Sequence, residues 1–392
     1  MTPRIFLVAG EVSGDIYGAD LVAALRRLHP DSELLAIGGP RMAAAGARCL
    51  VDSSGWGVVG WLEVLPRLPA FAYRLSAARR LIDRAAPAVV VLIDFPGFNL
   101  ALAQRLGRRV PIAYFVPPMV STRRGERARR IAGLGMRLLA VFPFEAQAYR
   151  AAGADVTFIG HPAVDRVRPS GPPQEIRRTL NVPPDAPLLA LLPGSRRQEL
   201  RRHLPVIVRA LPAVRARFPA VRAVLPVATP RHRAQVEAAM RAAAVPVALV
   251  EGGAPEGYDA LAASDFAVIT SGTATLEALC LGLPGIVIYR ASPLDYAIAR
   301  RIAAVRWAGL PSLLAGREVM PELLQNALTA SRLASAVIDW LADARRRNQQ
   351  RQDLLALRDQ LGEAGAAGRA AREILRLARL LGSEGSSTIQ TT

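Results

Sequence analysis

Short apolar runs alternate with helical stretches along the first part of the chain. The runs are RIFLVA (residues 4–9), ELLAIGG (33–39), AVVVLID (88–94), VPIAYFV (110–116) and RLLAVF (137–142), with helical patterns at residues 15–28 and 98–106. Near-continuous apolar strands separated by helices are typical of a parallel sheet that is buried on both faces. Residues 1–165 are therefore predicted to form a doubly wound α/β domain.

The same alternation restarts further along, with apolar runs at residues 187–194, 221–228, 245–250 and 265–270. The Pro- and Gly-rich residues 166–173 that precede them are interpreted as an interdomain linker. Residues 174–330 are predicted to form a second Rossmann-like domain that faces the first. Residues 331–381 show helical patterns without strands, and residues 382–392 have the composition of a disordered tail.

The composition adds a strong basic charge to this two-domain pattern. All 50 basic residues are Arg, and the formal net charge of the 392-residue chain is +18. Such a charge favours contact with nucleic acid, anionic lipid or a phosphorylated substrate, and composition does not choose among the three. Cys49 and Cys280 lie outside any metal-ligand spacing, so neither a disulfide framework nor a structural metal is expected.

The location of the protein is suggested by the lengths of its apolar runs. No segment reaches the ~20 apolar residues of a membrane span. The N-terminal run from Ile5 to Ala9 is too short for a signal peptide. A cytoplasmic protein, either soluble or peripheral to the membrane, is expected.

In open α/β sheets ligands bind beyond the carboxyl ends of the strands, and the first strand is followed by AGEVSGD. Gly10 and Gly14 permit a tight turn there, and Ser13 or Asp15 could cap the following helix. A turn with a cap is one complete interpretation of this block. Glu11 is needed for neither task and would face the ligand side. The block does not match G-x-G-x-x-G, so it supports dinucleotide binding only weakly.

Asp94 follows five apolar residues at the end of a predicted buried strand. Partial desolvation of a carboxylate raises its pKa and suits it to act as a general base. The alternative is a helix or turn cap beside Pro96. The sequence supports both interpretations equally.

In the second half, LLPGSR and TSGTATLE follow predicted strands. Gly194, Ser195 and Arg196 form a compact turn whose backbone donors and guanidinium group could hold phosphate oxygens.

The turn of Ser271, Gly272 and Thr273 would let a diphosphate approach the positive end of the following helix. Glu277 lies one turn further along, within reach of the hydroxyls of a nucleoside. The alternative makes Thr273 an N-cap and Glu277 a favourable charge near the helix start. The chain contains no D-x-D motif for a metal-held diphosphate, and His161, in IGHP, is interpreted as a hinge or turn residue.

Taken together, these blocks resemble the lipid-A-disaccharide synthase family of glycosyltransferases. The resemblance runs in order through AGEVSGD, GGPRM, GVVGWLEVL, IDFPGFN, PFE, FIGHP, LLPGSR, SGTATLE and LPSLLAGREVMPELLQ. It implies a GT-B fold with the acceptor mainly on the first domain and the UDP-sugar mainly on the second. A C-terminal helical segment, residues 331–381, would cross back and pack on the first domain.

The resemblance also implies the substrates. UDP-2,3-diacylglucosamine would donate a sugar to 2,3-diacylglucosamine 1-phosphate through an inverting displacement that forms a β-1,6 linkage, with no cofactor and no metal. The chain would act at the inner face of the cytoplasmic membrane, and a homodimer is compatible with this function. Nucleic acid is not an expected partner, because no reading module or aromatic-basic interleaving occurs.

Roles for individual residues follow from the same resemblance. Asp94 would be the general base on the acceptor 6-hydroxyl, and Glu11, Ser13 and Asn99 would complete the acceptor side. Arg196, with Gly194 and Ser195, and the turn of Ser271, Gly272 and Thr273 would bind the donor diphosphate. Glu277 would bind the ribose of UDP.

This chain departs from the family at three places: Gly97 replaces an acid, Ser312 replaces an Asn, and a Trp-rich block is missing after VPIAYFV. The alternatives are a UDP-sugar glycosyltransferase with another acceptor, such as the lipid-linked peptidoglycan N-acetylglucosaminyltransferase, a UDP-N-acetylglucosamine 2-epimerase, and an inactive family member.

An apolar segment at residues 55–75 is a candidate for membrane contact. It holds Trp56, Trp61, Leu62, Leu65, Phe71 and Tyr73 among few charges. A strand and helix that fill the core explain it equally well. Exposed on one face, the segment would dock acyl chains or the bilayer interface, and the positive charge would favour anionic lipid.

Overall fold

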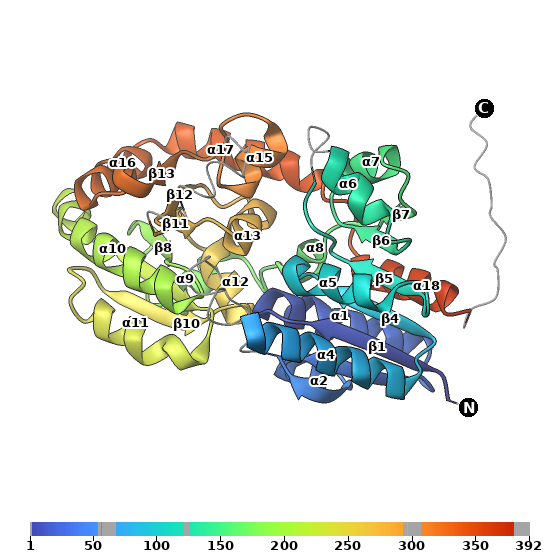
Figure 1. Cartoon of the computed structure of the whole chain (residues 1–392). Coiled ribbons are helices and arrows are strands. Elements are labelled where there is room, and N and C mark those ends of the chain that lie inside the picture. The colour runs from blue at the N-terminus through green and yellow to red at the C-terminus, as the bar shows by residue number, and fades with distance from the viewer. Residues whose placement is uncertain are drawn as a thin grey trace. The chain divides into compact units, whose positions relative to one another are not determined.

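A computed structural model describes residues 2–53, 56, 68–120, 125–292, 296 and 307–379, and the chain divides into two compact units (Figure 1). The first unit consists of residues 1–162 and 361–392, and the second consists of residues 163–360. Each unit is built around one parallel sheet with helices between successive strands. The predicted α/β fold with two doubly wound domains is confirmed.

The first unit holds a seven-stranded sheet in the order β3-β2-β1-β4-β5-β6-β7. Its elements are β1 (Arg4–Ala9), α1 (Val12–Leu28), β2 (Glu33–Gly38), α2 (Pro40–Ala44), β3 (Arg48–Asp52), α4 (Leu68–Ala85), β4 (Val89–Ile93), α5 (Pro96–Leu106), β5 (Ile112–Phe115), α6 (Gly125–Ala132), β6 (Arg137–Ala140), α7 (Pro143–Ala151), β7 (Val156–Phe158) and α18 (Ala366–Leu377). The strand order reverses between β1 and β4, which pair in parallel with Ala9 opposite Ile93. This reversal is the topological switch point at which α/β sheets bind ligands.

The second unit holds a six-stranded sheet in the order β10-β9-β8-β11-β12-β13. Its elements are α8 (Ala163–Arg166), α9 (Pro173–Thr179), β8 (Leu188–Leu192), α10 (Arg197–Arg217), β9 (Arg222–Val227), η3 (Pro230–His232), α11 (Arg233–Met240), β10 (Val247–Glu251), α12 (Pro255–Ala262), β11 (Phe266–Thr270), α13 (Thr273–Leu281), β12 (Gly285–Tyr289), α15 (Leu310–Ala315), β13 (Glu322–Leu324), η4 (Gln325–Ala327), α16 (Ala330–Ala342) and α17 (Ala344–Asp359). Its switch point lies between β8 and β11, where Leu192 pairs with Ile269.

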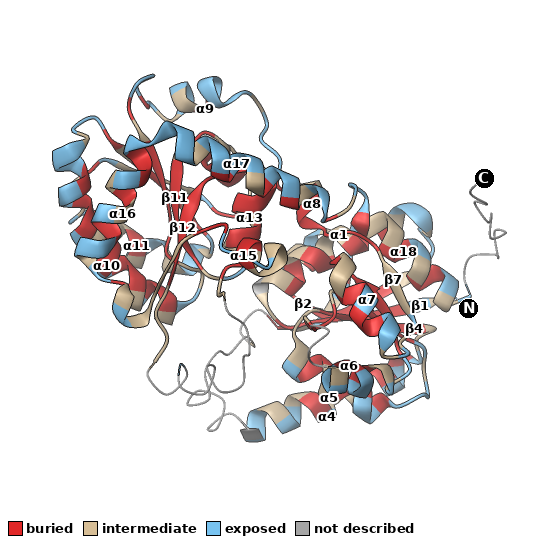
Figure 2. Ribbon diagram, turned by 90° about the horizontal axis from the view of Figure 1, so that it is seen from above, coloured by how far each residue is buried: buried red, intermediate tan, exposed pale blue. Residues whose placement is uncertain are grey.

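The central strands are the core of each unit, and Figure 2 shows them buried beneath helices whose outer faces are exposed. Every residue of β4, β8 and β11 is buried. Each fully buried Val, Leu or Ile side chain stabilises the fold by roughly 1.5–3 kcal/mol. Burial on both faces explains why these strands are apolar at every position rather than at alternate ones.

The C-terminal helices divide between the two units. Leu333, Val337 and Trp340 of α16 are buried in the core of the second unit, where Trp340 stacks on Phe266 with ring centroids 5.4 Å apart. Helix α17 belongs to the same unit, whereas α18 packs on α1 in the first unit. Residues 331–381 therefore do not all pack on the first domain as expected, because the apolar faces of α16 and α17 are buried in the second unit.

The boundary between the units also differs from the expected one. Residues 166–173, the expected linker, lie in the second unit between α8 and α9. The chain passes from one unit to the other at residues 162–163 and again at 360–361. The expected disordered tail, residues 382–392, lies outside the described residues.

In the first unit, the end of the N-terminal segment, near residue 161, lies beside the start of the C-terminal segment, near residue 361. The backbone N–H of His161 donates to the carbonyl of Leu361 at 2.8 Å, and Arg369 Nε donates to the carbonyl of Ile159 at 2.8 Å. The His161 ring is buried against Tyr17 and Phe142, and burial lowers the pKa of His161 to about 3. The ring is therefore neutral at physiological pH.

Candidate active site

The corner between β4 and α5 places Asp94 at the switch point of the first unit. Asp94 and Phe95 both have a φ of +49°, in the left-handed region that residues other than glycine rarely adopt. Each such residue costs of order 1–3 kcal/mol and persists only where its surroundings hold it. The corner is therefore a strained feature that fixes the direction of the Asp94 side chain.

Buried hydrogen bonds hold this corner in place. Asn99 Nδ2 donates to the carbonyls of Asp94 at 2.8 Å and Ile93 at 3.1 Å, and the Tyr114 hydroxyl also donates to the Asp94 carbonyl at 2.8 Å. Asn99 is completely buried. Asn99 therefore supports the Asp94 backbone through its side-chain amide.

The Asp94 carboxylate meets the first turn of α1. The Ser13 hydroxyl donates to Asp94 Oδ2 at 2.7 Å, so the structure brings together two predicted site residues. Glu11, the N-cap of α1, is half-buried and lies two residues before Ser13 in the sequence. Gly10 is required here, because a Cβ atom on it would lie 2.0 Å from the Phe95 ring. The Asp94 residue is half-buried, and its carboxylate is anchored to the first turn of α1 through Ser13.

Asp15 does not cap α1, although it was one of the two caps that the sequence offered. Its buried carboxylate accepts hydrogen bonds from the backbone N–H groups of Gly39 at 2.9 Å, Arg41 at 3.1 Å and Met42 at 3.0 Å. Asp15 therefore caps α2, an element 24 residues further along. The N-cap of α1 is Glu11, and both candidate caps, Ser13 and Asp15, bond elsewhere.

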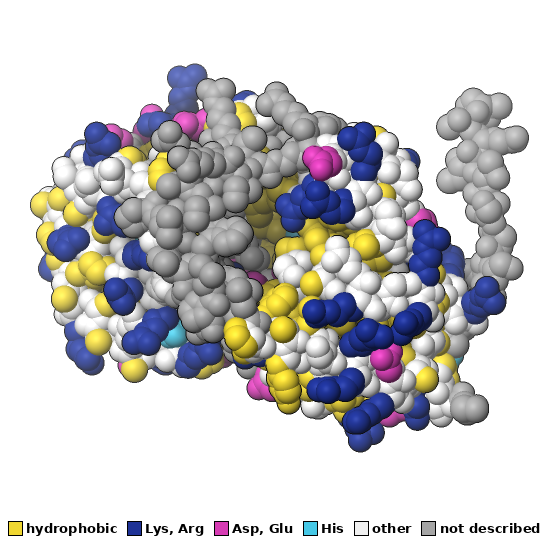
Figure 3. Space-filling view, viewed as in Figure 1, with side chains coloured by type: hydrophobic (Ala, Val, Ile, Leu, Met, Phe, Trp, Pro, Cys, Tyr) yellow, Lys and Arg dark blue, Asp and Glu magenta, His cyan; other side chains and the backbone are white. Residues whose placement is uncertain are grey.

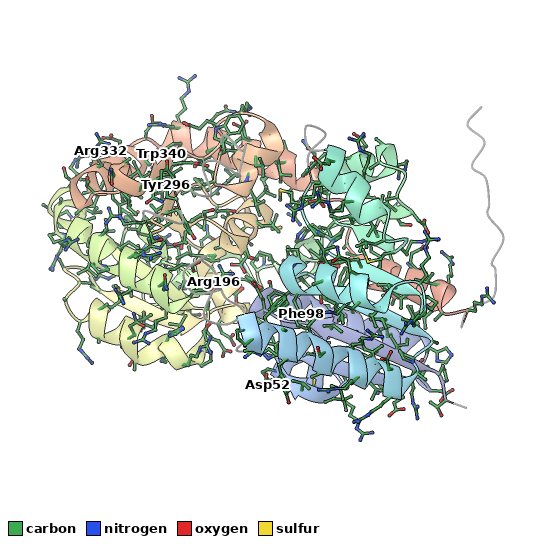
Figure 4. The ribbon with its side chains drawn as sticks, viewed as in Figure 1. Asp52, Phe98, Arg196, Tyr296, Arg332 and Trp340 are labelled. Carbon is green, nitrogen blue, oxygen red and sulfur yellow. The ribbon has the colours of Figure 1, made fainter. Side chains whose placement is uncertain are left out.

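In the second unit, the turn after β8 leads into α10, and Figure 4 shows Arg196 at the start of this helix. Glu199 Oε2 accepts from the backbone N–H groups of Ser195 at 3.0 Å and Arg196 at 3.2 Å. Glu199 Oε1 also lies 3.1 Å from Arg196 NH1. The predicted backbone donors to phosphate thus bond a buried carboxylate, while the Arg196 side chain remains 45% exposed and can reach a ligand.

Gly194 provides a test of this turn. Its φ is +114°, and a Cβ atom on it would lie 2.4 Å from Glu199 Oε2 and 2.6 Å from Glu199 Cβ. We expect Gly194→Ala to lower the free energy of unfolding by at least ~2 kcal/mol, as measured by urea denaturation. Gly97→Ala is the matched control, because a Cβ atom there meets nothing within 4 Å. An equal loss in both variants would contradict the proposed strain.

The turn after β11 opens α13. Gly272 is the N-cap, with a φ of +139° and a ψ of −154° that only glycine adopts readily. Thr273 is not the N-cap, because it is already the first residue of the helix. Its side chain is exposed. The Ser271 hydroxyl donates to the carbonyl of Ala308 at 2.6 Å. A glycine N-cap leaves the positive helix end open to close approach by an anion.

Glu277 lies on the same face of α13 as Thr273, one turn further along. Burial raises the pKa of Glu277 to about 7, and the positive charge of Arg166 opposes this increase. The Glu277 residue as a whole is half-buried. A partly buried acid whose ionised form is destabilised is a common property of binding and catalytic sites.

Glu322 is a supporting residue that sequence reasoning missed. Its carboxylate accepts from the backbone N–H groups of Ala308 at 2.9 Å and Gly309 at 2.8 Å, and the Ala308 carbonyl in turn receives the Ser271 hydroxyl. Burial raises the pKa of Glu322, and these backbone hydrogen bonds oppose the increase. Glu322 thus fixes the loop that supports the Ser271 turn.

Two of the departures from the family pattern fit their surroundings. Ser312 is completely buried, and its hydroxyl oxygen accepts from the backbone N–H groups of Val319 at 3.0 Å and Met320 at 3.2 Å. Gly97 is exposed in the first turn of α5. Ser312 is a satisfied loop residue, and Gly97 leaves the Asp94 corner intact.

Two solved structures with similar folds hold UDP or a UDP-sugar. UDP-GlcNAc 2-epimerase from Neisseria meningitidis, bound to UDP-GlcNAc, covers 96% of this chain and 100% of its own with a TM-score of 0.65 at 12% identity. MnaA from S. aureus, solved with UDP, covers 97% and 98% with a TM-score of 0.64 at 14% identity. At such identities the likeness shows the fold alone, which is the GT-B fold that the resemblance implied.

Sequence relatives are more specific. The model of the family described as lipid-A-disaccharide synthetase matches residues 5–374. Lipid-A-disaccharide synthase of Myxococcus xanthus is 42% identical over 377 residues, covering 96% of this chain and 97% of its own. The Syntrophus aciditrophicus enzyme of the same name is 38% identical over 375 residues, covering 95% and 97%. With its matching family model, GT-B fold and near-complete coverage, this chain belongs to the lipid-A-disaccharide synthase family of glycosyltransferases.

Proposed function

We propose that this glycosyltransferase moves 2,3-diacylglucosamine from UDP to the 6-hydroxyl of 2,3-diacylglucosamine 1-phosphate. The observation that carries the proposal is the Asp94 carboxylate, held by Ser13 on a strained corner at a sheet's switch point. In an inverting displacement the acceptor oxygen attacks the sugar C1 and gives its proton to Asp94. The bond from C1 to the diphosphate oxygen breaks with its electrons leaving on UDP, which yields a β-1,6 linkage.

The second unit supplies the groups that would stabilise the departing UDP. The exposed Arg196 guanidinium can pair with phosphate oxygens, and the open N-terminus of α13 can receive a diphosphate. Both features follow the strands that flank the switch point of this sheet. Glu277 would accept hydrogen bonds from the ribose hydroxyls. These groups act on charge that develops as UDP leaves, so they lower the barrier to transfer.

A product assay tests the proposal. The protein is incubated with both acylated substrates, and the disaccharide is identified by mass spectrometry, with the β configuration read from the coupling constant of the new anomeric proton. A parallel incubation with UDP-N-acetylglucosamine measures inversion at C2. Disaccharide without inversion at C2 is the expected result, and inversion without disaccharide would favour the epimerase alternative.

Membrane contact is the second part of the proposed function, and we place the enzyme at the inner face of the cytoplasmic membrane as a peripheral protein. No helix among the described residues is long and apolar enough to cross a bilayer. Of the predicted contact segment, Trp56 and Phe71 pack on Phe98, with ring centroids 5.2 and 5.6 Å apart, whereas Tyr73 is 69% exposed. The segment's Trp61, Leu62 and Leu65 lie outside the described residues.

Charge supports this membrane proposal. On the face drawn in Figure 3, arginine side chains lie scattered among apolar and uncharged ones. Arg74 lies over the Trp56 ring, 5.1 Å from its centroid, close to the exposed Tyr73 in sequence. A basic surface with an exposed aromatic residue suits an anionic bilayer interface.

We expect co-sedimentation with anionic vesicles at low salt and its loss in high salt. The reason is that the screening length falls from about 10 Å at 0.1 M salt to about 3 Å at 1 M. Vesicles of zwitterionic lipid are the control and should bind less at both salt concentrations. Equal binding to anionic vesicles at both concentrations would contradict an electrostatic contact.

A further inference from the structure

His203 links three strand ends of the second unit. It lies on α10, is completely buried, and is the residue one helical turn after Glu199. His203 Nδ1 lies 2.8 Å from the carbonyl oxygen of Pro193 and 3.1 Å from Thr270 Oγ1. His203 Nε2 lies 3.0 Å from the backbone nitrogen of Arg290. One imidazole ring thus contacts the ends of β8, β11 and β12, which are neighbours in the sheet.

The partners of the His203 ring fix its protonation. The backbone N–H of Arg290 can only donate, so Nε2 must carry a lone pair. The Pro193 carbonyl can only accept, so Nδ1 must carry the proton. His203 is therefore neutral, in the Nδ1–H form, and the Thr270 hydroxyl oxygen shares the same proton as a second acceptor.

The charges around His203 agree with a neutral ring. Burial lowers its pKa, and Arg290 and Arg202 lower it further. The Pro193 carbonyl and Glu199 act in the opposite direction. The Tyr289 ring packs beside the imidazole with centroids 5.8 Å apart. Protonation at Nε2 would bring a second N–H against the N–H of Arg290 and break the link to β12.

Two of the residues bonded to His203 lie immediately before the two turns assigned to the diphosphate. Pro193 directly precedes Gly194, Ser195 and Arg196, and Thr270 directly precedes Ser271 and Gly272. Glu199 holds the N–H groups of the first turn, and His203 holds its carbonyl end. The N-terminal part of α10 therefore holds the Gly194–Arg196 turn at both of its ends. Through His203 it also ties this turn to the Ser271–Thr273 turn.

We propose that His203 is a positioning residue for the donor, which sets the spacing of the Gly194–Arg196 turn and the Ser271–Thr273 turn to that of a sugar-linked diphosphate. This inference rests on the proposed assignment of these turns to UDP. His203 itself is buried and acts through Pro193 and Thr270. Its loss should therefore weaken binding of the diphosphate and spare binding of the nucleoside.

Three substitutions of His203 separate the hydrogen bonds of Nδ1, to Pro193 and Thr270, from the hydrogen bond of Nε2, to Arg290. His203→Asn keeps a donor near the Nδ1 position, where it can still reach Pro193 and Thr270. His203→Gln keeps an acceptor near the Nε2 position for Arg290 and loses the donor. His203→Leu removes the hydrogen bonds of both nitrogen positions and replaces the ring with an apolar side chain of similar size. Thermal unfolding of each purified full-length variant shows whether it is folded.

Calorimetry with UDP and with uridine gives the readout. We expect His203→Leu to lower UDP affinity by about 10–100-fold, as for loss of the buried hydrogen bonds of both ring nitrogens, and to leave uridine affinity within about twofold of wild type. His203→Asn should recover more UDP affinity than His203→Gln, because both diphosphate turns are tied at Nδ1. Unchanged UDP affinity in folded His203→Leu, equal losses for UDP and uridine, or no recovery in His203→Asn would overturn the inference.

A double-mutant cycle covers the case in which His203→Leu does not fold. If His203 acts by placing the Arg196 turn, combining His203→Gln with Arg196→Ala should lower UDP affinity by less than the product of the two single effects. Fully multiplicative effects would overturn the inference. Wild type that binds no UDP would instead overturn the donor assignment on which it rests, whereas UDP binding that is insensitive to His203 would overturn this inference alone.

Discussion

Asp94→Asn is expected to lower kcat for disaccharide formation by about 10²–10⁴-fold, the usual contribution of a general base. Asparagine keeps the size of the side chain and an oxygen that can accept from Ser13, so the strained corner at residues 94–95 should survive. The amide cannot take the proton of the acceptor hydroxyl. Because Asp94 lies in the first unit and the groups proposed to bind UDP lie in the second, UDP affinity measured by calorimetry should not change.

Asp52→Asn is the matched control for this experiment. Asp52 is an exposed acid at the carboxyl end of β3, in the same sheet as β4 (Figure 4). Its replacement should leave kcat within about twofold of wild type, as expected for a surface substitution away from the site. A similar kcat in Asp94→Asn and wild type would show that another group accepts the proton.

Glu277→Gln is expected to stabilise the protein and weaken donor binding together. Burial raises the pKa of Glu277 from 4.5 to about 7, so between these values the folded chain keeps a proton that the unfolded chain has lost. Ionisation of Glu277 therefore lowers stability as the pH rises through this window, and the full cost, on the order of 3 kcal/mol, applies above pH 7. Glutamine removes that cost, so the gain should be largest at pH 8 and should shrink towards pH 5.

The same substitution should weaken UDP binding by about tenfold, because hydrogen bonds from the ribose hydroxyls to a carboxylate are stronger than those to an amide. Urea denaturation at pH 5 and pH 8 measures stability, and calorimetry measures UDP affinity. Glu256→Gln, which changes an exposed acid on α12, is the control and should alter neither quantity. A stability gain independent of pH would contradict the role of burial, and unchanged UDP affinity would remove Glu277 from the ribose site.

The central strands could be predicted from sequence because both of their faces are buried, which makes every position apolar. Three edge strands, β3, β7 and β13, could not be predicted in this way, whereas the edge strand β10 could be, from its apolar run at residues 245–250. Strand β3 alternates between exposed and partly buried residues, and β7 and β13 have three residues each, all partly exposed. Their positions depend on pairing with a neighbour rather than on an apolar run.

The placement of α16 in the second unit was also missed, since an apolar helix face does not reveal which sheet it covers.

The places of the proposed site residues Asp94 and Arg196, at the ends of strands, were predictable from their sequence positions alone. Their partners were not, because Ser13 and Asp94 are 81 positions apart and meet only when β1 pairs with β4. Asn99 was placed on the acceptor side by resemblance to the family, and only the fold shows its burial. His203 carried no motif, and its role follows from three backbone or hydroxyl partners on separate strands.

The division of the first unit into two chain segments has a consequence for biosynthesis. Helix α18 packs on α1, β4 and β5, and its Ala370, Ile374 and Leu375 are completely buried. The first unit therefore cannot complete its core until residues 366–377 have left the ribosome, whereas the second unit is one continuous segment, residues 163–360. Vectorial synthesis thus favours closing the second unit first. A nascent chain that stops after residue 360 would leave the apolar surface under α18 uncovered and open to proteolysis.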